Sequence, residues 1–191
     1  MDSMRSQDVV ILLKLISLQT QEAMCPNDPR WNFESDGANS MRGLQAQLGI
    51  SKTEISASIH RSLAAGLAIK DRRSGRPKPN RRYLHGFIVH GLRFVFPARP
   101  GAITRGIPTA FAAPMLKGRL LLGSDDSCVW PASDGQINGQ CVHPLFRSVP
   151  DAARKDELLY EYLALIDAIR LGGPREFRVA AETLSERLLK R

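Results

Sequence analysis

Apolar side chains recur every three to four residues in four segments of the first half of the chain, as they do on one face of an α-helix. The expected helices cover residues 7–20, 41–48, 52–65 and 81–92. The first is apolar around most of its circumference, which predicts a well-buried helix. Ser40 can cap the second helix, and Ser51 with Glu54 matches a capping box at the start of the third. Gly49 and Gly66 are typical of helix ends.

Three short segments carry β-forming residues. Leu67 to Ile69 is a strand candidate directly after the third helix. The segments 87–89 and 94–96 are also rich in β-forming residues, so a strand is the alternative to the fourth helix. We favour the helix at 81–92, followed by an extended segment at 93–96.

The second half of the chain changes character twice. Residues 97–150 hold seven prolines and six glycines, which predicts a mostly irregular segment with a short helix near 115–121. Within it, 129–130 and 137–142 flank a turn at 132–135 and suggest a small hairpin. Helical periodicity returns at Asp151 and is interrupted at Gly172-Gly173, and Pro174 suits the first turn of a last helix.

Together these elements predict a mainly α, α+β protein in three parts. Residues 1–96 form an N-terminal domain and residues 97–150 an irregular Pro/Gly-rich segment with a small hairpin. Residues 151–191 form a C-terminal helical hairpin suited to dimerisation. Apolar residues at 158–169 or in the first helix are the expected contacts of a homodimer.

The charge is concentrated in one region. The 191 residues carry a net charge of +8, and residues 51–100 alone hold 11 Lys and Arg against 2 Asp and Glu. A block of this kind is typical of a surface that binds phosphates. Three cysteines are too few for a disulfide scaffold and favour the cytoplasm. No apolar run reaches the ~20 residues of a membrane span, so no membrane association is expected.

The segment from Ser40 to Gly66 resembles the helix-turn-helix of winged-helix transcription regulators of the MarR, ArsR and Lrp type. The matching residues are Leu44, Leu48, Gly49, Ile50, Ser51, Ile55, Ile59, Arg61, Gly66 and Leu67. The resemblance covers about residues 7–80. It implies a winged helix-turn-helix domain and a homodimer that reads two half-sites in double-stranded DNA.

The third helix is the expected recognition helix. Ile55, Ile59 and Leu63 recur every four residues and are expected to pack it against the first two helices. Its opposite face is then free to enter a major groove, where hydroxyls, imidazole and cations contact base edges or phosphates. The expected DNA-contacting side chains of this face are Lys52, Thr53, Ser56, His60 and Arg61, with Ala57 exposed among them.

A basic loop follows the third helix. Its cations suit a minor groove or flanking phosphates, as those of a wing do. They are Arg72, Arg73, Arg76, Lys78, Arg81 and Arg82. Because the pattern after Asn80 is helical, no returning strand is expected beyond the loop.

Other kinds of site have weaker support. Cys128, Cys141 and His143, with Cys25 as a fourth residue, fit no standard zinc spacing, so buried free thiols are expected in place of a metal. No nucleotide-binding or hydrolase motif is present, so neither an enzyme nor a cofactor is expected. The alternative function is a protein-interaction module, antitoxin-like or adaptor, that docks through the same surface. A small-molecule or protein effector is a further possible partner.

Overall fold

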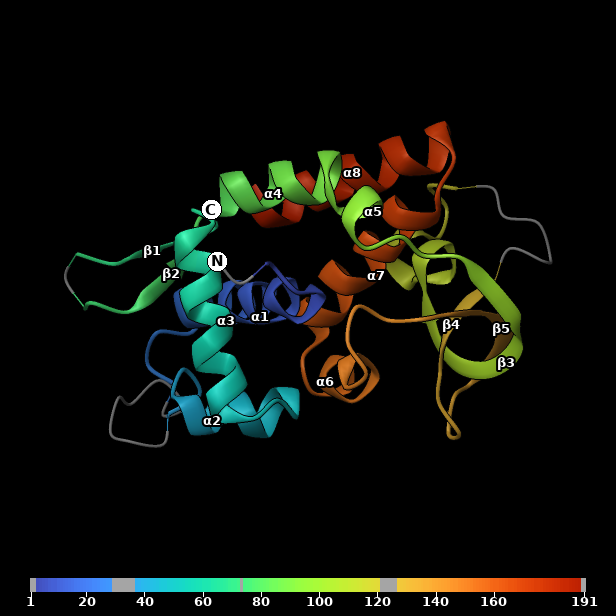
Figure 1. Cartoon of the computed structure of the whole chain (residues 1–191). Coiled ribbons are helices and arrows are strands. Elements are labelled where there is room, and N and C mark those ends of the chain that lie inside the picture. The colour runs from blue at the N-terminus through green and yellow to red at the C-terminus, as the bar shows by residue number, and fades with distance from the viewer. Residues whose placement is uncertain (1–2, 29–36, 73, 121–126, 190–191) are drawn as a thin grey trace. The chain divides into compact units, whose positions relative to one another are not determined.

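The chain divides into two compact units, Met1–Leu84 and His85–Arg191. The computed structural model describes residues 3–28, 37–72, 74–120 and 127–189 (Figure 1). It is mostly helical with two small sheets, which confirms the α+β class. The division falls inside α4 (Arg81–His90), twelve residues before the domain end expected at 96.

The first unit begins with three helices where the sequence predicts them. They are α1 (Ser6–Met24), α2 (Met41–Leu48) and α3 (Lys52–Ala64). The Ser40 hydroxyl accepts the N–H of Gly43, and Gly49 ends α2 with a φ of 64°, in the left-handed region that favours glycine. The Ser51 hydroxyl accepts the N–H of Glu54 at the start of α3. Local capping chemistry therefore sets the ends of α2 and the start of α3.

A two-stranded antiparallel hairpin follows α3, so the expectation of a loop without a returning strand is wrong. Strand β1 (Ala68–Lys70) pairs with β2 (Pro77–Pro79), with Ile69 opposite Lys78. The helix predicted after Asn80 is nevertheless present, because β2 ends one residue before it. Two prolines in three residues argue against a strand, which explains why the pattern did not predict β2.

The prolines occupy the outer edge of the hairpin. The N–H of Asn80 donates to Leu67 O, and the N–H of Asp71 donates to Arg76 O. Since backbone direction alternates along a strand, Pro77 and Pro79 have their nitrogens on the side away from β1. A proline nitrogen donates no hydrogen bond, so this edge resists pairing with another strand.

The second unit contains a small closed barrel, so residues 97–150 are not mostly irregular. Its strands are β3 (Pro100–Thr109), β4 (Cys128–Pro131) and β5 (Ile137–Val142). Both short strands run antiparallel to β3, and they pair with each other in parallel. The strands expected at 129–130 and 137–142 are confirmed, but the hairpin pairing predicted between them is wrong.

Glycines allow the barrel to close. A Cβ on Gly135 would overlap the backbone of Gly106, and a Cβ on Gly106 would overlap the carbonyl oxygen of Trp130. A Cβ on Gly139 would lie 2.5 Å from the carbonyl oxygen of Ser127. These glycines therefore serve close approach between strands, in addition to breaking helical periodicity.

The remaining segments of the second unit are helical. The extended segment expected at 93–96 is instead a short helix, α5 (Leu92–Val95). Of the helix expected near 115–121, residues 115–120 contain only the end of a 3-10 turn, η3 (Pro114–Leu116), which follows another, η2 (Ala110–Ala112); residue 121 lies outside the described residues. The chain ends in α6 (Val149–Lys155), α7 (Glu157–Leu171) and α8 (Pro174–Leu189).

The predicted C-terminal helical hairpin is confirmed as α7 packed on α8, and α7 also contacts η2 and β3 (Figure 1). The helix expected to run from Asp151 is broken at Asp156, whose carboxylate accepts the N–H of Leu159 and caps α7. Every side chain from Tyr162 to Arg170 is buried within the chain. Of the stretch 158–169 expected to supply a dimer interface, Leu158 and Tyr160 are half-buried, and the homodimer itself stays a prediction.

A buried carboxylate joins α7 to the barrel. Asp167 accepts the indole N–H of Trp130 at 2.6 Å and the hydroxyl of Thr109 at 3.0 Å. Its other oxygen binds Arg170 at 2.7 Å, and Arg170 Nε donates to the carbonyl oxygen of Phe96 at 2.8 Å. Burial raises the pKa of Asp167, an effect that the Arg170 charge opposes. The cluster links three separate segments through one side chain.

Trp130 also packs edge-on against Tyr160, with ring centroids 5.9 Å apart. The Tyr160 hydroxyl donates to the carbonyl oxygen of Pro108 at 2.8 Å. Burial raises the pKa of Tyr160 to about 12, so this hydroxyl stays a donor even in alkaline solution that ionises an exposed tyrosine.

Candidate nucleic-acid interface

The outward face of α3 carries most of the side chains that the sequence assigned to it. Lys52, Thr53 and His60 are exposed, and Ser56 and Ala57 are half-buried. Lys52 and Thr53 lie in the first turn of the helix, immediately after the Ser51 cap. The helix therefore presents a cation, two hydroxyls and an imidazole along one side.

The buried face of α3 differs from the predicted one. Ile55 is fully buried as expected, but Ile59 and Leu63 are only half-buried, and Ser58 and Ser62 are buried instead. The buried face is therefore turned by about a quarter of a helical turn relative to the row of apolar residues. The hydroxyls of Ser58 and Ser62 have no hydrogen-bond partner among the described residues.

This rotation predicts a difference between two isoleucines. Ile55→Ala is expected to lower the free energy of unfolding by about 2–5 kcal/mol, because the side chain is fully buried. Ile59→Ala is expected to lower it by less than about 2 kcal/mol, since that side chain is only partly buried. Urea denaturation of the two variants measures both values. Equal losses, or a larger loss for Ile59→Ala, would show that α3 is turned as its apolar pattern suggests.

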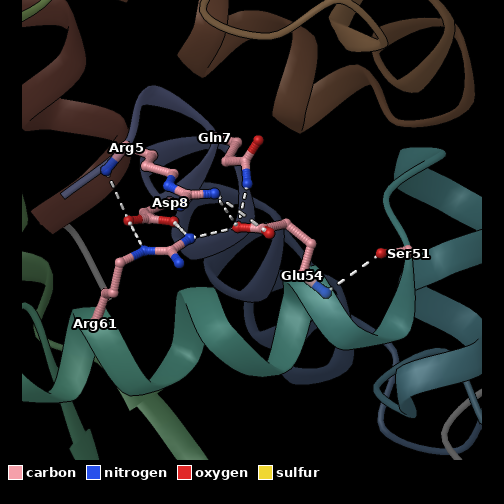
Figure 2. A network of polar contacts seen from close by, with 6 residues as sticks. All are labelled: Arg5, Gln7, Asp8, Ser51, Glu54 and Arg61. Atoms are coloured by element: carbon pink, nitrogen blue, oxygen red, sulfur yellow. Dashed lines mark hydrogen bonds and ion pairs between the residues drawn. The ribbon is translucent and has the colours of Figure 1, made fainter. Parts of the chain in front are cut away.

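Arg61 is not on the exposed face, so the expectation that it is available to DNA is wrong. Its side chain is 5% exposed and makes a bidentate contact with Asp8 of α1, whose side chain is 0% exposed (Figure 2). Arg61 Nε lies 2.9 Å from Asp8 Oδ2, and Nη2 lies 2.7 Å from Asp8 Oδ1. The hydrogen bonds to Asp8 raise the pKa of Arg61 above its ordinary value. Arg61 therefore ties α3 to α1.

Glu54 extends this network to the surface. Its Oε1 accepts from Arg61 Nη2 at 2.6 Å and from the amide of Gln7 at 2.5 Å. Arg5 Nη1 lies 3.3 Å from Oε1 and 3.4 Å from Oε2 (Figure 2). The carboxylate of Glu54 thus connects α3 to the start of α1, and only the backbone N–H of Glu54 takes part in the cap with Ser51.

Sequence reasoning missed Arg5, Gln7 and Asp8 because they lie 47 or more residues from their partners on α3. One signal was present: Asp8 is the one acid among the mostly apolar residues 7–18 of α1, and a buried acid requires a partner.

The hairpin carries the second set of predicted residues. Arg72, Arg76 and Lys78 are exposed, and so is Lys70 on β1, which sequence reasoning left out of the site. Arg73 lies outside the described residues. Near the tip, Asp71 accepts both the N–H and the hydroxyl of Ser74. The exposed cations are therefore displayed on a folded hairpin.

The last two predicted residues begin α4 and differ in exposure. Arg82 is exposed, whereas Arg81 is half-buried and its Nη2 donates to the Thr20 hydroxyl at 3.0 Å. Arg81 thus links the start of α4 to α1, and its charge is less accessible than that of Arg82.

The cysteines do not assemble a site in the described part of the chain. Cys25 is exposed, Cys128 buried and Cys141 half-buried, and no disulfide joins any two of them. Cys128 and Cys141 lie on the neighbouring strands β4 and β5, where Cys141 is opposite Val129. Over residues 3–28, 37–72, 74–120 and 127–189, no three His, Cys, Asp or Glu side chains gather as metal ligands would.

No family model matches this chain, and no curated protein or solved structure matches it. None of the helices in the described ranges is both long and apolar enough to cross a bilayer. The likeness to winged-helix regulators therefore rests on the residues of this chain and supports a proposal.

Proposed function

We propose that this chain binds double-stranded DNA in a sequence-specific manner and acts as a transcription regulator, with α3 as the recognition helix and the β1–β2 hairpin as the wing. One observation carries the proposal. The same compact unit holds three helices, the polar outward face of α3 and, directly after α3 in the chain, a folded hairpin whose described residues include four exposed cations.

The dimensions of α3 suit a major groove. An α-helix with its side chains is about 10–12 Å across, and the groove is about 12 Å wide. The exposed side of α3 would face base edges, where Lys52 suits guanine and the hydroxyls of Thr53 and Ser56 accept or donate as the base requires. His60 lies farther along the same side. Sequence preference is assigned to these residues.

The hairpin suits the phosphate backbone. The stretch that holds Lys70, Arg72, Arg76 and Lys78 contains one acid, Asp71, whose carboxylate accepts from Ser74. The proline edge prevents strand addition, so the hairpin meets partners through its side chains. Binding through these cations is expected to be independent of base sequence.

The proposed regulator is a homodimer that places two such units on two half-sites. Because the α7 residues from Tyr162 to Arg170 are buried within the chain, the dimer contacts are assigned to other surfaces.

The test is the salt dependence of binding after four exposed cations of the hairpin are replaced. They are Lys70, Arg72, Arg76 and Lys78, each changed to Gln. Each phosphate contact contributes about 0.9 to the slope of log affinity against log salt, so the slope is expected to fall by up to about 3–4 per subunit. Fluorescence anisotropy between roughly 50 and 200 mM salt measures it, on a duplex selected by the wild-type protein and on a random duplex. The preference between the duplexes is expected to persist.

A matched control removes the same charge from the second unit. It replaces four exposed arginines by Gln, namely Arg99, Arg147, Arg175 and Arg178, and is expected to leave the slope near the wild-type value. If the two variants lower the salt slope equally, binding depends on the net charge of the protein and not on the hairpin. A wild-type protein that binds no duplex even at low salt would contradict the proposal and favour a protein-docking role for the same surface.

A further inference from the structure

We propose that Arg5 is a phosphate-binding residue of the DNA interface, held by Glu54 beside the first turn of α3. This inference rests on the proposed function and adds a contact from α1, outside the basic block of residues 51–100. Arg5 is a cation on a side chain that is 55% exposed, whereas Arg61 in the same network is 5% exposed (Figure 2).

The backbone of Arg5 is fixed. Its N–H donates to Asp8 Oδ2 at 2.8 Å, and Asp8 is itself held by the bidentate contact with Arg61. The guanidinium therefore starts from an anchored point at the beginning of α1, next to Glu54 in the first turn of α3. An anchored cation loses less conformational entropy on binding a phosphate than one on a free chain end.

The guanidinium of Arg5 has spare donors. Only Nη1 contacts Glu54, at 3.3 and 3.4 Å, and among the described residues nothing accepts from Nε or Nη2. A guanidinium carries five N–H donors in a planar fork that suits phosphate oxygens. Arg5 can therefore bind a phosphate while it stays in contact with Glu54.

The rest of the network does not depend on Arg5 for its charge balance. Glu54 Oε1 keeps Arg61 at 2.6 Å and Gln7 at 2.5 Å. Asp8 keeps both contacts with Arg61. Arg5 is thus the member of the network that can engage a ligand without leaving a buried charge unpaired.

The place of Glu54 on α3 favours a phosphate as the ligand of Arg5. Glu54 and Arg61 lie seven residues apart, two turns along one flank of the helix, between its buried side and its exposed side. When a helix fills a major groove, its exposed side meets base edges and its flanks meet the phosphate walls. Arg5 extends from that flank and is placed for a backbone contact that is independent of sequence.

The experiment compares Arg5→Gln with the wild-type protein on the selected and the random duplex over roughly 50–200 mM salt. The salt slope is expected to fall by about 0.9 per subunit on both duplexes, with an affinity loss of about 3- to 10-fold at the lowest salt. Arg5→Lys keeps the charge and is expected to restore most of the slope. Arg154→Gln removes an ion-paired arginine from the second unit and is expected to leave the slope unchanged.

Two results would overturn the inference. One is an unchanged slope for Arg5→Gln while the hairpin variant lowers it, which leaves the proposed DNA binding intact. The other is a lower melting temperature for Arg5→Gln with a slope that Arg5→Lys fails to restore, which assigns Arg5 to folding alone. Failure of the proposed function itself is distinguishable, because the wild-type protein would then bind neither duplex.

Discussion

Replacing Arg61 by methionine is expected to lower the free energy of unfolding by about 3–5 kcal/mol, as measured by urea denaturation. The variant removes the bidentate partner of Asp8, whose side chain is 0% exposed. A carboxylate left in that position has lost both its hydration and its counter-charge, and methionine supplies neither. Glu54 loses its Arg61 contact as well.

The matched control is Arg82→Met, which removes an exposed arginine of the same unit and is expected to change stability by less than about 0.5 kcal/mol. The double variant Asp8→Leu with Arg61→Met removes both charges and is expected to recover part of the loss, because no buried ion remains unpaired. If Arg61→Met is as stable as Arg82→Met, the ion pair contributes nothing and Arg61 is accessible, as the sequence alone suggests.

Replacing Asp167 by alanine is expected to destabilise the protein by a similar amount, about 3–5 kcal/mol. The variant leaves Arg170 buried without its carboxylate and removes the acceptor of the Trp130 indole and of the Thr109 hydroxyl. The Trp130 and Thr109 donors then lose their acceptor, while Arg170 Nη1 keeps only the carbonyl oxygen of His143 at 3.5 Å, and each unsatisfied group adds to the loss. Urea denaturation gives the stability, and near-UV circular dichroism reports the fixed environment of Trp130.

Two further variants test the cause. Asp167→Asn keeps an acceptor for Trp130 and Thr109 but removes the charge. Its free energy of unfolding is therefore expected to lie between those of the wild type and Asp167→Ala. Asp151→Ala breaks an exposed contact with Arg154 on α6 and is expected to cost less than about 1 kcal/mol. Similar stabilities for Asp167→Ala and Asp151→Ala would show that the buried cluster does not hold the barrel to α7.

In the candidate interface, sequence reasoning located the exposed cations and hydroxyls but not their supports. Lys52, Thr53 and His60 are exposed because α3 is amphipathic, a property of its own thirteen residues. Arg61 belongs to the same polar pattern, yet its role depends on Asp8 in another helix. The sequence of a helix does not distinguish an arginine that pairs with a buried acid of another helix from one that faces water.

The sequence by itself determined those features that depend on residues close together in the chain. The bounds of α2, the start of α3 at Ser51 and the start of α8 at Pro174 follow from caps, glycines and prolines within a few residues of each end. The concentration of charge in residues 51–100 is likewise a property of the chain itself. Such signals are readable because their energies arise from contacts within one or two helical turns.

Only the tertiary structure decided the pairings. Strand β2 forms despite two prolines because their nitrogens face away from β1, and β4 pairs in parallel with β5 because β3 is long enough to pair with both strands. The rotation of α3 likewise depends on a contact with a distant segment. The ion pair of Arg61 with Asp8 accompanies a buried face turned away from the row of Ile55, Ile59 and Leu63. These choices depend on which distant surfaces meet, so the periodicity of a single segment does not contain them.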